Sequence, residues 1–131
     1  MHHLVYVSLA STNQPEATLL LQLNHWRATN ARLNITGLLL LSDAGDIMQV
    51  LEGEQATVHT LYAVIAADRR HRSVVKLADG PIPTRAFANW SMHFRTVPAT
   101  DFTRLVPQPG PAHARNLLPL LETFMNEKPV V

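Results

Sequence analysis

The chain has 131 residues, which is room for one domain, and it lacks cysteine, which excludes disulfides and thiol chemistry. Its formal net charge is +1 with both signs interspersed, so the concentrated basic face of a nucleic-acid-binding protein is not expected. Only 16% of residues are charged, which favours an apolar surface used in self-association. We expect a cytoplasmic protein, because neither a signal peptide nor an apolar stretch of membrane-spanning length is evident.

The first third of the chain predicts a strand, a helix and a second strand. Residues 4–9 are rich in β-favouring valine and tyrosine. Pro15 suits the first turn of a helix, and leucines at helical spacing extend that helix from 16 to about 29. Residues 34–42 are rich in leucine and predict a largely buried strand.

The following residues predict a hairpin, a second helix and two more strands. A turn at 43–46 leads into a strand at 47–51. Apolar residues at helical spacing then predict a helix over 55–68. Strands follow at 73–78 and 90–97, separated by a loop with two prolines. This order predicts an α+β fold of the ferredoxin-like type, a βαββαββ mixed sheet with two helices on one face.

The composition changes after the last predicted strand. A proline-rich break precedes a leucine-rich segment that predicts a helix over 113–126. We therefore expect residues 1–97 to form the domain and residues 98–131 to form a C-terminal helical extension of the same domain.

The sequence shows neither a metal-ligand motif nor a catalytic nucleophile. Its seven histidines fall on different predicted elements without a short ligand spacing, and the adjacent His2 and His3 point to opposite faces of a strand. We therefore expect no metal site. No serine occupies a Gly-x-Ser-x-Gly turn and no glycine-rich phosphate loop is present. A small ferredoxin-like enzyme is thus the weaker alternative.

Two polar side chains stand inside apolar strands. If strand alternation holds, Gln49 shares one face with Ile47 and Leu51. It lies either at a sheet surface near water, or toward the helices, where it needs a hydrogen-bond partner. Its amide both donates and accepts, so rotation of the amide exchanges its partners. Tyr6 lies in the middle of the first strand, where a buried phenol also needs a partner.

Five short runs of residues stand in a specific order along the chain. They are Leu4-Val5-Tyr6-Val7-Ser8, Asn30 followed by Ile35-Thr36-Gly37-Leu38, Gln49-Val50-Leu51-Glu52-Gly53, Asp68-Arg69-Arg70-His71 and Trp90-Ser91-Met92. In this order and spacing the chain resembles the BLUF domain family over roughly residues 3–97. The resemblance implies a ferredoxin-like sheet with a flavin held between its two helices. That flavin is normally FAD, with FMN or riboflavin as alternatives.

The resemblance also implies roles for individual residues. Tyr6 would be the light-driven donor of an electron and a proton. Gln49 would relay the proton and then rearrange its hydrogen bonding to the flavin. Trp90 and Met92 would pass the change outward. The residues expected to contact the flavin are Gln22, Trp26, Thr29, Asn30, Ile65, Asp68, Arg70 and His71.

The first predicted helix departs from the usual pattern of the family. Gln22, Trp26 and Asn30 are four residues apart and share one helix face, so all three face the flavin if Asn30 does. The family usually has an aliphatic and a small residue at the first two positions. A bulky indole there would alter the seating of the flavin ring and donate an electron unproductively. Alternatively, Trp26 packs at the edge of the pocket.

The expected function is that of a blue-light photoreceptor without enzymatic activity. Its signal would be a rearranged hydrogen-bond network around Tyr6 and Gln49. The signal would pass to an unknown downstream protein or within a homo-oligomer, with neither nucleic acid nor a membrane as partner. The alternative is a flavin-free BLUF-like adaptor that binds other proteins.

Overall fold

The computed structural model describes residues 1–10, 16–43, 45–67, 71–88 and 92–105. The elements in chain order are β1 (His2–Ala10), α1 (Glu16–Arg32), β2 (Thr36–Ser42), β3 (Asp46–Gly53), α2 (Gln55–Ala67), β4 (His71–Pro81), β5 (His93–Val97) and α3 (Ala99–Leu105). They match the predicted order, so the ferredoxin-like α+β fold is confirmed. The helix α3 was not predicted, and the helix predicted over 113–126 lies outside the described residues.

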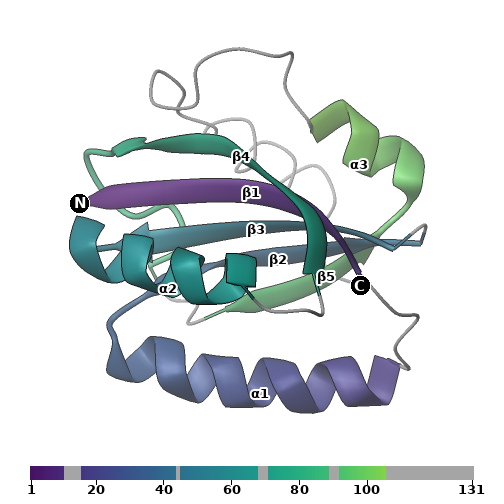
Figure 1. The fold of residues 1–131 in the computed structure, drawn as a ribbon, viewed down its shortest axis with the longest axis horizontal. Helices are drawn as coiled ribbons and strands as arrows, with labels where there is room; N and C mark the ends of the chain where they lie inside the picture. The colour runs from purple at the N-terminus through teal and green to yellow at the C-terminus, as the bar shows by residue number, and fades with distance from the viewer. Residues whose placement is uncertain (11–15, 44, 68–70, 89–91, 106–131) are drawn as a thin grey trace.

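The five strands form one mixed sheet in the order β4-β1-β3-β2-β5. β1 lies between β4 and β3 and is antiparallel to both, whereas β2 pairs with β5 in parallel. Figure 1 shows α1 and α2 each running along the sheet, with α3 set apart from them. None of the helices in the described ranges combines the length and the apolar character needed to cross a membrane.

Strand alternation divides the core into two layers on opposite faces of the sheet. One face buries a cluster that contains Leu4, Tyr6 and Leu51, against which Trp26 of α1 and several side chains of α2 pack. The other face buries the alternate residues, Val5 among them, under the segment that follows β4 and under α3. The two helices that follow β1 and β3 therefore cover the face that carries Tyr6.

Two glycines are required by the hairpin of β2 and β3. A Cβ atom at Gly37 would lie 1.9 Å from the carbonyl oxygen of Val50, so no larger residue fits without moving the strands. Gly45 has a φ of 91° in the turn, a conformation that side chains other than glycine rarely adopt. The amide of Asp46 donates to Oγ of Ser42 at 3.0 Å and closes the same turn. The predicted turn at 43–46 is thereby confirmed.

Candidate functional site

Tyr6 and Gln49 are direct neighbours across the pair of strands β1 and β3. Because they are paired in register, their side chains project to the same face of the sheet, the face covered by α1 and α2. Tyr6 is fully buried and Gln49 is 6% exposed. The hydroxyl of Tyr6 donates a hydrogen bond to Oε1 of Gln49. The predicted alternation is confirmed, and the alternative in which Gln49 lies at a sheet surface near water is wrong.

The amide nitrogen of Gln49 has a weak partner. Its Nε2 donates to Sδ of Met92 at 3.5 Å, and a thioether sulfur is a poor acceptor. Met92 is 1% exposed and directly precedes β5. One end of the amide is therefore held firmly by a phenol, while the other end has capacity for a stronger acceptor. An amide in this position can exchange its two ends by rotating about its terminal side-chain bond.

Aromatic and aliphatic side chains from both helices surround this pair. Trp26 and Ile65 are partly buried and pack against the cluster that contains Tyr6. The ring of Tyr62 lies beside that of Tyr6, with a centroid distance of 5.6 Å and a tilt of 58°. These contacts shield the phenol from water, so its hydrogen bond to Gln49 is made in a medium of low polarity, where it is strong.

Most of the chain matches one known protein family. Residues 1–93 match the family described as BLUF, the sensors of blue-light using FAD. The chain belongs to the BLUF family. It is therefore a flavin-binding sensor of blue light, and the buried Tyr6–Gln49 pair is the hydrogen-bond network present at its centre.

Similar proteins include large light-regulated enzymes and a chain of about the length of this one. The photoactivated adenylate cyclase subunit alpha of Euglena gracilis is 36% identical over 63 residues, which is 48% of this BLUF chain but 6% of that protein. Among solved structures, BlsA in its ground state is 27% identical, with a TM-score of 0.73, and the match covers 96% of this chain and 85% of that one. Klebsiella pneumoniae BlrP1 with FMN and cyclic diGMP is 26% identical, with a TM-score of 0.71, and the match covers 96% and 34% respectively.

The structure places some of the predicted flavin contacts of this BLUF domain on the face that carries Tyr6. Trp26 and Ile65 contact the cluster around Tyr6. Thr29 is partly buried near the end of α1, and the neighbouring Asn30 is 3% exposed. The side chains of the remaining predicted residues lie outside the described part of the structure; these residues are Gln22, Asp68, Arg70, His71 and Trp90.

Sequence reasoning missed the role of Glu52, which is fully buried on the opposite face of the sheet. Its Oε2 accepts the backbone N–H of Ala86 at 2.6 Å, and its Oε1 accepts that of Phe87 at 3.1 Å. The hydroxyl of Thr36 also donates to Oε1 at 2.9 Å. Glu52 thus holds the segment after β4 against the sheet. The signal that could have revealed this role is an acidic residue within an otherwise apolar strand.

Two arginines for which the sequence predicted no role connect separate elements of the fold. Nε of Arg27 on α1 donates to the carbonyl oxygen of Met92 at 2.8 Å. Arg85 donates to the carbonyl oxygens of Asn34 and Glu52 at 2.7 and 3.1 Å, at the end of the β2–β3 hairpin. The contact of Arg27 joins the helix beside Tyr6 to the residue that contacts the Gln49 amide.

The pKa of one titratable group close to this region is lowered. Burial lowers the pKa of His93, and the positive charges of Arg95 and Arg27 lower it further. His93 is the first residue of β5 and directly follows Met92. The start of β5 therefore favours an uncharged imidazole in the folded protein.

Proposed function

We propose that this BLUF domain binds FAD and that light changes the hydrogen-bond partner of Gln49. The observation that carries this proposal is the pair of contacts made by Gln49, a firm one from Tyr6 to Oε1 and a weak one from Nε2 to Met92. A side chain with one strong and one weak partner can be driven between two arrangements by a small change in free energy.

The residues present fit a flavin. The polar edge of a flavin offers carbonyl oxygens and ring nitrogens, and Nε2 of Gln49 has capacity for such an acceptor. The amide of Asn30 supplies a second buried donor and acceptor at the end of α1. Trp26 and Ile65 supply apolar surface for the ring itself. FAD is the flavin that the family description names, although one solved relative contains FMN.

When bound, the flavin supplies absorption of blue light and an excited state that takes an electron from a nearby phenol. Tyr6 is the phenol in place, and its proton already points at Oε1 of Gln49. As Tyr6 gives up an electron, its phenolic proton moves toward Oε1. When the electron returns, the proton returns as well, so no atom is gained or lost. Once the proton is back on Tyr6, the amide would rotate and present Nε2 to the oxygen of Tyr6 and Oε1 to the former partners of Nε2.

The signal then leaves the pair through Met92 and Trp90. Rotation of the Gln49 amide replaces the donor that faces Met92 by an acceptor, which removes the contact between Nε2 and the sulfur. The carbonyl of Met92 is bound to Arg27, so the change reaches both α1 and the start of β5. We propose that the chain itself is not an enzyme and that its output passes to a protein partner or to a second copy of the chain. The low charged fraction of 16% supports such an association surface.

Absorption spectroscopy of the purified protein tests the proposal. The protein is expected to be yellow and to show a reversible red shift under blue light. Tyr6→Phe and Gln49→Leu should retain flavin but lose the normal shift. Tyr62→Phe is the matched control, because it removes the hydroxyl of the tyrosine whose ring packs beside that of Tyr6. This variant should retain the shift. A normal photocycle in Tyr6→Phe and Gln49→Leu would contradict the mechanism.

A further inference from the structure

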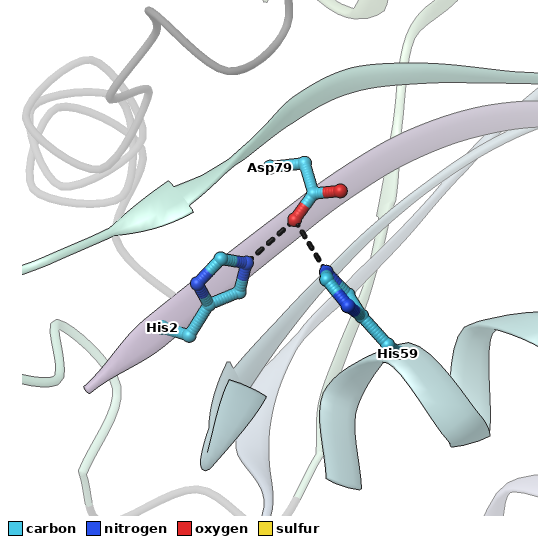
Figure 2. Close-up of side chains that lie close together, drawn as sticks. All are labelled: His2, His59 and Asp79. Atoms are coloured by element: carbon cyan, nitrogen blue, oxygen red, sulfur yellow. Dashed lines mark hydrogen bonds and ion pairs between the residues drawn. The ribbon is translucent and has the colours of Figure 1, made fainter. Parts of the chain in front are cut away.

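Two histidines and an aspartate from three separate elements meet on the sheet at a distance from the Tyr6–Gln49 pair. His2 lies at the start of β1, His59 lies on α2, and Asp79 lies near the end of β4. Nε2 of His2 is 2.5 Å from Oδ1 of Asp79, and Nε2 of His59 is 2.8 Å from the same oxygen. Figure 2 shows both imidazole rings pointing at this single oxygen.

The three side chains present the donor set of a metal site with an open position. One ligand atom from each residue lies within 4.8 Å of the other two. Two imidazoles and one carboxylate, with the fourth position left to water, form a recurrent zinc site. Bonds of about 2.0–2.1 Å in a tetrahedron place ligand atoms roughly 3.3 Å apart. The two nitrogen–oxygen contacts would therefore need to widen by roughly 0.5 to 1 Å, which small side-chain rotations provide.

Neighbouring groups orient these ligands. Nζ of Lys76 donates to Oδ2 of Asp79 at 2.8 Å, which fixes the carboxylate and leaves Oδ1 directed at the two imidazoles. The rings of His2 and His59 are nearly perpendicular, at 86°, so each nitrogen approaches that oxygen without the rings colliding. Partners that hold ligating side chains in position are a regular part of metal sites. The Lys76 ammonium also lowers the affinity for a cation, because it repels positive charge nearby.

The site is open on one side. The side chains of His2 and Asp79 are 9% and 16% exposed, whereas that of His59 is 42% exposed. An ion can therefore enter past His59 and keep a water molecule as its fourth ligand. Along β1, His2 and Tyr6 are four residues apart on one face, which corresponds to roughly 13 Å. The site is thus separate from the Tyr6–Gln49 pair, although α2 contributes to both.

We propose that His2, His59 and Asp79 bind a zinc ion, which clamps α2 to β1 and β4. Zinc suits the set because it accepts imidazole and carboxylate ligands together in a tetrahedron. The expectation of no metal site was based on spacing along the chain. The fold, however, brings Asp79 into contact with His2, which is 77 positions away, and with His59, which is 20 positions away.

Isothermal titration of the flavin-loaded protein with zinc chloride, after chelator treatment and without a polyhistidine tag, tests this proposal. We expect one zinc ion per chain and at least a tenfold loss of affinity in His59→Asn. His25→Asn is the matched control, because it removes an exposed histidine from α1 and should bind zinc as the parent does. Because His59 is distant in sequence from the amino terminus, its variant also distinguishes this site from chelation by the terminal residues.

Thermal unfolding provides an independent measurement. Zinc should raise the melting temperature of the parent and of His25→Asn, because a ligand that binds only the folded state stabilises it. The same zinc concentration should raise that of His59→Asn by clearly less, and the circular dichroism of this variant without metal should match the parent. Failure of the parent to bind one equivalent of zinc would overturn the proposal. Equal affinities in the parent and His59→Asn, or equal losses in His59→Asn and His25→Asn, would also overturn it.

Discussion

Replacing Glu52 by glutamine should destabilise the fold markedly, even though the side chain keeps its shape. The carboxylate of Glu52 is fully buried and accepts three hydrogen bonds, from the backbone amides of Ala86 and Phe87 and from the hydroxyl of Thr36. A glutamine offers a single carbonyl oxygen. If that oxygen stays with Phe87 and Thr36, the new NH₂ group faces the N–H of Ala86, and two donors then meet where a donor and an acceptor met before.

The magnitude follows from the bonds that change. A buried donor left without an acceptor costs about 1–3 kcal/mol. The two remaining bonds lose their charge assistance, which roughly halves their strength. We therefore expect the free energy of unfolding to fall by about 3 kcal/mol. With a slope of about 2 kcal/mol per molar urea, the unfolding midpoint should decrease by about 1.5 M.

Urea unfolding in the dark at a fixed flavin concentration measures this change, because a bound ligand shifts apparent stability. Glu54→Gln is the matched control: it makes the same change of charge at an exposed position two residues further on, and should alter stability by less than about 0.5 kcal/mol. Equal midpoints for Glu52→Gln and Glu54→Gln would show that the carboxylate does not hold the segment after β4 in place.

Three further predictions concern the hairpin, the start of β5 and the first helix. Gly37→Ala should destabilise the protein by about 3 kcal/mol in urea unfolding, because its Cβ would collide with a carbonyl of β3. Gly53→Ala has contacts no closer than 3.4 Å and should cost less than about 1 kcal/mol, so similar losses would contradict the packing argument. Burial and two arginines lower the pKa of His93 in the folded protein below the ordinary histidine value of 6.5, which applies to the unfolded chain. Below pH 6.5 the unfolded chain therefore binds a proton that the folded protein does not, so the free energy of unfolding should fall as the pH drops through 6.5. His93→Gln should weaken this fall, measured by urea unfolding between about pH 7 and about pH 5, whereas His25→Gln should not, and equal pH dependence in both variants would refute the assignment. If the indole of Trp26 competes with Tyr6 as electron donor, Trp26→Phe should raise the quantum yield of photoconversion. An unchanged or lower yield would place that indole outside the path of electron transfer.

Strand alternation is the reason that the sequence predicted correctly which neighbours share a face with Gln49. Apolar residues on both sides of Gln49 identified a strand, and the period of two then placed the side chain on the same face as its neighbours Ile47 and Leu51. The pairing with Tyr6 required the register of β1 against β3, which depends on contacts between distant segments. The family resemblance supplied that pairing, and residue patterns alone would not have done so.

Other features depend on tertiary contacts that leave little trace in the sequence. The helix α3 is short, and its Phe102 is buried against the face opposite α1 and α2. A segment of this length is stabilised mainly by packing, so local propensity gives a weak signal. The cluster of His2, His59 and Asp79 was missed for a similar reason, because motif searches detect ligands that are close along the chain.

The central claim is that illumination changes the hydrogen bond between Tyr6 and Gln49. Infrared difference spectra, recorded light minus dark on protein with isotope-labelled glutamine side chains, test it most directly. We expect the side-chain carbonyl band of Gln49 to shift on illumination and to recover in the dark, and the shift to be absent in Tyr6→Phe. A spectrum in which no labelled glutamine band changes, or in which it changes equally in Tyr6→Phe, would contradict the account.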